Sequence, residues 1–173
     1  DNATGTIDAA NYNTGVGVDV FAALTTGDNN VAVGYQSLNA NTTGSHITAI
    51  GKDAMLLNTT GAENTAVGTS ALDANTTGSY NIALGGGALG SNTTADNNTA
   101  LGYTALLSNT TGAKNTAVGS LALDANTTGS NNTAFGYNSL TANTTANNNT
   151  AFGYESAKAN TTGTANVAIG KSA

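Results

Sequence analysis

Glycine returns at every seventeenth position along almost the whole of this chain. The series is Gly34, Gly51, Gly68, Gly85, Gly102, Gly119, Gly136, Gly153 and Gly170, and Gly17 extends it backwards. Each glycine from Gly34 on follows an alanine and an apolar residue, as in Ala66-Val67-Gly68. A fixed period of this length is typical of one small structural unit that is stacked along an axis.

The unit is too short and too often interrupted to form a stable helix, because isolated helices of about half its length are marginal in water. Thr, Val, Ile and Phe around the repeated alanine favour short strands. Glycine and the Asn-rich groups favour corners. We therefore predict an all-β fold, a parallel β-solenoid with about ten coils and a length of roughly 45–50 Å at ~4.8 Å per strand. Residues 1–16 are expected to be an irregular lead-in, with segment 13–17 as a degenerate strand, and residues 17–173 a single solenoid domain.

In such a stack each residue lies over the residue one period later in the chain, so a column repeats one residue type. One column is asparagine throughout: Asn41, Asn58, Asn75, Asn92, Asn109, Asn126, Asn143 and Asn160. A second asparagine column is interrupted only by Ile47 and consists of Asn30, Asn64, Asn81, Asn98, Asn115, Asn132, Asn149 and Asn166. Stacked side-chain amides hydrogen-bond along such a ladder, so both columns are predicted to hold neighbouring coils together.

The corner after each Thr-Thr pair is less strict than the first glycine column. It holds glycine at Gly61 and Gly78 but alanine at Ala95 and Ala146. Because alanine disfavours a positive φ, the backbone at this corner is predicted not to require one.

Two apolar columns are predicted to form the dry interior. One consists of Val33, Ile50, Val67, Leu84, Leu101, Val118, Phe135, Phe152 and Ile169, and the other of Leu38, Met55, Leu72, Leu89, Leu106, Leu123 and Leu140. Neighbouring residues of a strand point to opposite sides, so Ala66 and Ala71 are expected on the other face. That second apolar face needs a cover, and a sister chain in a homotrimer or another oligomer would provide one.

The amino-acid composition limits the partners, cofactors and cellular locations that we expect for this chain. The net charge is −6, only 8% of residues are charged and only four are basic, which excludes a surface that follows nucleic-acid phosphates. No apolar run approaches the length of a membrane span, so we expect no membrane insertion. The chain has no cysteine, hence no disulfide or thiolate metal site, and we expect no cofactor. A weakly charged surface rich in Asn, Thr, Ser and Gly favours an extracellular location, on a cell surface or a virion.

Two phrases carry a resemblance to a known family. Segments 64–68 (Asn-Thr-Ala-Val-Gly) and 166–170 (Asn-Val-Ala-Ile-Gly) resemble the Hep/Hag-type head repeat of YadA-like trimeric autotransporter adhesins. The longer phrase 132–145 resembles repeats in phage tail-fibre-like and bacterial surface proteins, and the similarity extends from about residue 13 onward. The resemblance implies a left-handed β-roll, three chains to a head, and binding to host surface molecules. The adhesin repeats are usually a few residues shorter, and the extra residues here fall around the Asn-Thr-Thr corner.

Residues with catalytic chemistry are few and scattered. The single histidine, His46, has no carboxylate in its own coil, so a solvated corner position is expected. Asp73 and Asp124 share a column but lie three coils, ~14 Å, apart, which is too far for a glycosidase pair. The run Gly85-Gly86-Gly87 lacks the lysine and the helix of a phosphate loop and is interpreted as a thin coil. The chain also lacks the Asp-bearing glycine repeats of calcium-binding solenoids. We predict a protein that is not an enzyme and has no metal site.

Two sets of residues are candidate binding surfaces. The first is a threonine column, Thr42, Thr59, Thr76, Thr93, Thr110, Thr127, Thr144 and Thr161, next to a second column that runs from Thr43 to Thr162. Regular threonines on a solenoid face could order water, although only one of two adjacent columns is expected to face solvent unless the pair sits at a corner. The second set is Tyr35, Tyr103, Tyr137 and Tyr154, which could stack on sugars, meet a partner or cover the edge of a coil. Asn-Thr-Thr also matches the N-glycosylation pattern, but a ladder is favoured because sites ~4.8 Å apart cannot all carry glycans.

The function predicted from the sequence is a non-enzymatic structural or adhesive segment of an extracellular fibre, a surface adhesin or a phage tail fibre. It would act as a rigid stalk or an attachment surface, with itself, a surface glycan or a host receptor as partner. The alternatives are an ice-binding solenoid, a protein that stacks head to tail into filaments, and a polysaccharide-processing solenoid. The sequence stops in mid-coil at residues 171–173, so we expect a piece of a longer fibre or an end that stacks on another molecule.

Overall fold

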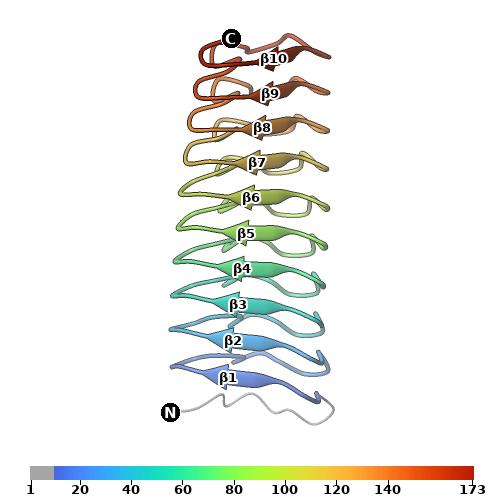
Figure 1. The fold of residues 1–173 in the computed structure, drawn as a ribbon. Coiled ribbons are helices and arrows are strands. Elements are labelled where there is room, and N and C mark those ends of the chain that lie inside the picture. Colours follow the sequence, from blue (N-terminus) through green and yellow to red (C-terminus); the bar gives the residue numbers. More distant parts are fainter. Residues whose placement is uncertain (1–9) are drawn as a thin grey trace.

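A computed structural model describes residues 10–173, and these residues form a straight stack of coils with one short strand per coil (Figure 1). The strands are β1 (Thr14–Val16), β2 (Val31–Val33), β3 (Thr48–Ile50), β4 (Thr65–Val67), β5 (Ile82–Leu84), β6 (Thr99–Leu101), β7 (Thr116–Val118), β8 (Thr133–Phe135), β9 (Thr150–Phe152) and β10 (Val167–Ile169). They make one parallel sheet in sequence order, and the described residues contain no helix. The predicted parallel β-solenoid is confirmed.

The register of the sheet equals the sequence period. Ile82 of β5 pairs with Thr65 of β4, and Ala83 pairs with Ala66, and the same one-period offset recurs between all neighbouring strands. Equivalent positions of successive repeats therefore lie directly over one another, as the columns predict.

The sheet begins slightly earlier than the predicted start of the domain at residue 17. The degenerate strand expected in segment 13–17 is present as β1, which pairs with β2 in the common register. The earlier part of the predicted lead-in, residues 1–9, lies outside the described residues.

One of the two predicted interior columns is in the interior. The column of Leu38, Met55 and the leucines that follow as far as Leu140 is fully buried, which is worth roughly 1.5–3 kcal/mol for each such side chain. The other predicted column is not buried. Its place in the interior is taken by the small residues at the centre of the strands: Ala32, Ala49, Ala66, Ala83, Ala100, Ala117, Ala134 and Ala151. A further buried column, next to that of Leu72, consists of Ala54, Ala71, Ala88, Ala105 and Ala122.

The prediction that the column from Val33 to Ile169 lines the interior is wrong. Its side chains point out of the sheet, and Ile50, Leu101 and Phe152 are 39%, 44% and 52% exposed. A three-residue strand turns its middle residue to one side and both neighbours to the other, and here the middle residue faces inward. The outer sheet face, defined here as the first and third residues of β1–β10, therefore carries the larger apolar side chains.

The inward–outward alternation of neighbouring side chains also fails at the column of Leu72, for a different reason. Ala71 and Leu72 are neighbours and yet both are fully buried. Ser70 and Leu72 adopt left-handed backbone conformations with φ of 52° and 56°, so this segment is not extended. A β-branched residue in that conformation is a true outlier, and the column of Leu72 contains Phe, Leu, Met and Ala but no Val, Ile or Thr.

Candidate functional site: ladders and outer faces

The first asparagine ladder, Asn41 to Asn160, is a continuous chain of side-chain hydrogen bonds. The Nδ2 of Asn75 donates to Oδ1 of Asn58 at 2.8 Å and to the carbonyl oxygen of Gly78 at 2.9 Å. The same two bonds recur along the column, with amide-to-amide distances of 2.8–3.3 Å. Because the asparagines from Asn41 to Asn143 are fully buried, each amide depends on its neighbours for partners. The predicted ladder is confirmed for this column.

The second asparagine ladder, Asn30 to Asn166, uses a different set of bonds. The Oδ1 of Asn64 accepts the backbone N–H of Asn81 at 2.8 Å, and its Nδ2 donates to the carbonyl oxygen of Gly78, also at 2.8 Å. The amides therefore link the backbones of adjacent coils, which corrects the predicted amide-to-amide stacking for all but the last rung, where Asn166 donates to Asn149. Since Ile47 has no side-chain acceptor, it interrupts this pattern.

The two ladders share an acceptor at the corner glycine column. A Cβ on Gly78 would lie 2.5 Å from Oδ1 of Asn75 and would also contact the carbonyl oxygen of Ala95. Its φ is not positive, and Ala95 and Ala146 occupy equivalent positions with 6% and 4% exposure. The prediction that this corner does not need a positive φ is confirmed.

The glycine column after each strand is strict. Gly68 has a φ of 136°, and a Cβ there would lie 2.6 Å from the backbone carbonyl group of Gly85. The corner column accepts alanine although its next coil approaches as closely, so the positive φ is what restricts this column to glycine and explains why it is never interrupted.

The two threonine columns differ in exposure. The Oγ1 of Thr76 donates to the carbonyl oxygen of Thr93 at 3.0 Å, and its equivalents from Thr42 to Thr127 do the same to the next coil. These hydroxyls belong to the scaffold and most are half-buried. The exposed threonine column, defined here by the position of Thr77, consists of Thr43, Thr60, Thr77, Thr94, Thr111, Thr128, Thr145 and Thr162. The prediction that one column faces solvent is confirmed for the greater part of the stack.

Two aromatic pairs lie on the coils of β8 and β9. The rings of Phe135 and Phe152 stack with centroids 4.7 Å apart, and those of Tyr137 and Tyr154 stack at 5.4 Å. Because each pair joins successive coils, the rings face one another along the stack and present their edges to solvent. This arrangement favours the role of covering coil edges over that of a sugar platform, which requires a free ring face.

The tyrosine column does not form one continuous site. Tyr137 and Tyr154 are in contact, whereas Tyr35 and Tyr103 lie in separate coils that are four repeats apart. The ammonium of Lys52 lies 5.9 Å from the ring centroid of Tyr35, within the range of a cation–π contact.

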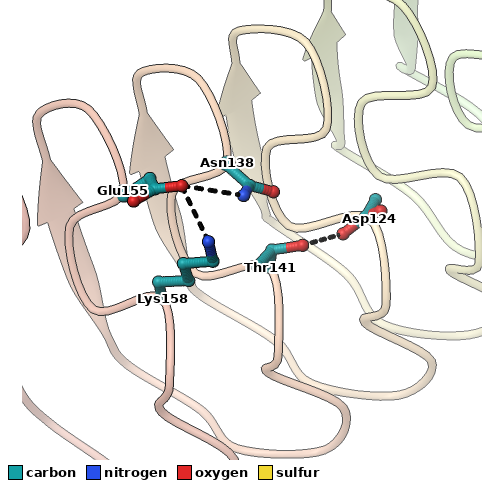
Figure 2. Close-up of polar contacts among 5 residues, drawn as sticks. All are labelled: Asp124, Asn138, Thr141, Glu155 and Lys158. Atoms are coloured by element: carbon teal, nitrogen blue, oxygen red, sulfur yellow. Dashed lines mark hydrogen bonds and ion pairs between the residues drawn. The ribbon is translucent and has the colours of Figure 1, made fainter.

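Polar side-chain contacts that sequence reasoning missed lie on the coils of β7 to β9, two of them within a column and one within a single coil. Glu155 accepts from Lys158 at 2.7 Å and from Asn138 at 3.4 Å. The hydroxyl of Thr141 donates to Asp124, and these contacts can be followed in Figure 2. The hydrogen bond from Lys158 lowers the pKa of Glu155 below its usual range. A search for complementary side chains one period apart would have found the pairs Asn138–Glu155 and Asp124–Thr141.

The candidate catalytic residues remain apart. His46 is exposed and contacts Asn29 at 3.4 Å, and burial raises the pKa of Asp73, which lies three coils from Asp124. Among residues 10–173 there is no pocket, no group of three or more acidic or histidine side chains placed to hold a metal ion, and no helix that could cross a membrane.

Comparison with known proteins gave no match to a family model, a curated protein or a solved structure. The basis for a function is therefore the geometry of the ladders and of the outer faces.

Proposed function

We propose that this chain is a rigid, non-enzymatic segment of an extracellular fibre that assembles with copies of itself through the outer sheet face. The observation that carries the proposal is the unbroken apolar column on that face, from Val16 to Ile169, whose side chains are half-buried or exposed in the single chain. Monomeric soluble proteins rarely expose a contiguous apolar strip that runs the length of the molecule.

The composition of the outer sheet face supports a like partner. Its two columns contain only Thr, Val, Ile, Leu and Phe and no charged residue, while the chain as a whole carries a net charge of −6. Parallel copies could therefore bring these faces together without burying a charge, which would be costly. Because the face repeats with every coil, matching positions of two parallel copies would also meet at every coil.

The interior supports a mechanical role. Along most of the stack, each coil is tied to the next by the backbone ladder of the sheet and by both asparagine ladders. The first ladder begins at Asn41, and Ile47 interrupts the second. Because the construction otherwise recurs from coil to coil, the same architecture can be extended to any number of repeats, as in other solenoids. A stalk or attachment surface needs stiffness and length, and this design provides both.

The resemblance to YadA-like adhesin heads and tail-fibre repeats makes a homotrimer with left-handed coils the favoured assembly. In this proposal the exposed faces away from the trimer axis would meet a surface glycan or a host receptor. Phage fibres and cell-surface fibres both need stiffness and length, so the proposal covers both kinds of fibre.

The mass of the protein in solution tests self-association. A trimer of 16.9 kDa chains has a mass of about 51 kDa, three times the chain mass, and we expect this species by light scattering. Leu101→Lys would place a charge in the centre of the outer sheet face and should dissociate the assembly, whereas Thr94→Lys on the exposed corner should not. A monomer of 16.9 kDa at high protein concentration would overturn the self-association part of the proposal.

Ice binding is a second candidate because the exposed threonine column is regular and free of interruptions from Thr43 to Thr162. The hydroxyls of this column are exposed and do not make the scaffold bonds of the neighbouring column. Thermal hysteresis in a concentrated solution tests it, with Thr94→Lys as the variant that should abolish the effect. The absence of hysteresis in the wild-type protein would remove this candidate.

A further inference from the structure

The chain contains two classes of Asn-x-Thr sequon with opposite environments. Every member of the first asparagine ladder is followed by Thr-Thr and so is a sequon, whereas members of the second ladder such as Asn64-Thr65-Ala66 are not. Three further sequons begin in another column, at Asn97, Asn131 and Asn148. The sequon that begins at Asn2 lies outside the described residues.

The ladder sequons are closed in the folded protein. Asn75 is fully buried, and both hydrogens of its Nδ2 are used, one toward Asn58 and one toward Gly78. Glycosylation replaces one of those hydrogens by a bond to a sugar carbon, so it removes a ladder bond and requires space that the interior does not have. Leaving a buried acceptor without a partner is costly in addition.

The other three sequons are open. Asn97, Asn131 and Asn148 are exposed and lie two residues before the first threonine of β6, β8 and β9. Their side chains point away from the interior that holds the ladders, so a glycan could extend into solvent. Asn131 and Asn148 lie one coil apart, and the ~4.8 Å between coils leaves room for one glycan on that pair.

We propose that the folded protein is an N-glycan acceptor at Asn97 and at one of Asn131 and Asn148, and that glycosylation of the ladder sequons is incompatible with the solenoid. In the transfer step the side-chain amide nitrogen attacks the anomeric carbon of a lipid-linked oligosaccharide diphosphate. The N–C bond forms, the bond from that carbon to the diphosphate oxygen breaks, the amide loses one proton, and the lipid diphosphate leaves. The order of folding and glycosylation therefore decides whether the chain reaches its native state.

The first test compares the folded protein with short peptides as substrates of an oligosaccharyltransferase that recognises Asn-x-Thr. The protein is made in a bacterial cytosol without such an enzyme, and peptides 72–80 and 94–102 present the Asn75 and Asn97 sequons without the fold. We expect both peptides to be modified. On the protein, glycopeptide mapping should find Asn97 and one of Asn131 and Asn148 occupied. Occupancy at Asn75 should be at least about 100-fold lower than on its peptide, because access requires local opening of a buried rung.

The second test reverses the order of events. The chain is directed into a eukaryotic secretory pathway with and without an inhibitor of lipid-linked oligosaccharide synthesis. Without the inhibitor we expect ladder glycans and no cooperative melting, and with it a folded product of the same sequence. Replacing the exposed threonine column by alanine deletes the ladder sequons without touching an asparagine and should also restore folding. A secreted protein that carries a glycan on a ladder asparagine and melts like the bacterial product would overturn the proposal, as would a folded protein that accepts no glycan at the three open sites.

Discussion

The Nδ2 of Asn75 lies 2.8 Å from the Oδ1 of Asn58 in the preceding coil, and both asparagines are fully buried. The Oδ1 of Asn75 in turn accepts from Asn92 in the following coil at 2.9 Å. Each rung therefore completes the hydrogen bonding of its two neighbours, and one missing amide affects three coils. This dependence makes the first asparagine ladder sensitive to the loss of a single amide.

Asn75→Ala is expected to lower the free energy of unfolding by about 3 kcal/mol, because it leaves buried donors and acceptors on both sides without partners. Thr77→Ala, two residues away on the exposed threonine column, is the matched control and should change it by less than about 0.5 kcal/mol. Urea unfolding followed by circular dichroism measures both. Equal effects of the two substitutions would show that the ladder does not stabilise the stack.

The two glycine columns are expected to respond differently to the same substitution. Gly68→Ala combines a φ of 136° with a contact of 2.6 Å to the backbone of Gly85, so it should cost more than about 3 kcal/mol or prevent folding. Gly78→Ala should cost less than Gly68→Ala although its Cβ would lie 2.4 Å from the carbonyl oxygen of Ala95, because its φ is not positive and Ala95 and Ala146 already occupy its column. Thermal melting of the two variants tests this order, and a Gly68→Ala protein as stable as the wild type would contradict it.

Thr104 is a point of strain. It is a β-branched residue with a φ of 50°, and its Oγ1 is buried without a hydrogen-bond partner. Thr104→Asn should raise the free energy of unfolding by about 1 kcal/mol, since asparagine tolerates this conformation and occurs there at Asn138. The same change at Thr116, in strand β7, should be destabilising because asparagine disfavours strands. A lower melting temperature for Thr104→Asn would show that the strain is not relieved.

The stability contributions of Asp73 and Glu155 are expected to change with pH in opposite directions. Burial raises the pKa of Asp73 above its usual value, so its contribution to stability is full in acid and is lost as the pH rises through the raised pKa. Asp73→Asn should therefore match the wild type in acid and exceed it at pH 7, by less than about 1 kcal/mol because the side chain is half-exposed. The hydrogen bond from Lys158 lowers the pKa of Glu155, whose contribution is present at neutral pH and is lost as the pH falls. Melting curves between about pH 3 and 7 cover the titration of free carboxyl groups and test both sites. Relative to the wild type, Asp73→Asn should gain stability as the pH rises, and Glu155→Gln should lose it.

The sequence period was sufficient to predict the parallel solenoid, its one-period register and the first asparagine ladder, because stacking makes a repeat in sequence a column in space. It was not sufficient to decide which side of a three-residue strand faces inward, and alternation alone treats Ala66 and Val67 as equivalent choices. The left-handed conformation of Leu72 also lies outside a prediction based on strands and turns. Its one sequence signal is the absence of β-branched residues from that column.

The bonds of the second asparagine ladder could not be predicted for a related reason. A repeated asparagine indicates a ladder, but its partner depends on which way the coil turns next to it. Asn64 and Asn75 both donate to the carbonyl oxygen of Gly78. They differ at Oδ1, which accepts the backbone N–H of Asn81 in Asn64 and the side-chain amide of Asn92 in Asn75. Columns show which residues are neighbours along the stack, and only coordinates show the contacts across a coil.

The stacking of equivalent positions in successive repeats is the claim on which the whole account depends, and disulfide formation tests it most directly because the chain has no cysteine of its own. Thr77→Cys with Thr94→Cys places two thiols one coil apart, ~4.8 Å between strands, within the Cα range that a disulfide spans. Thr77→Cys with Thr111→Cys places them two coils apart, at about 10 Å, beyond that range. We predict that mild oxidation closes an intramolecular disulfide in the first variant and not in the second. Closure of the second in preference to the first would contradict the stacking.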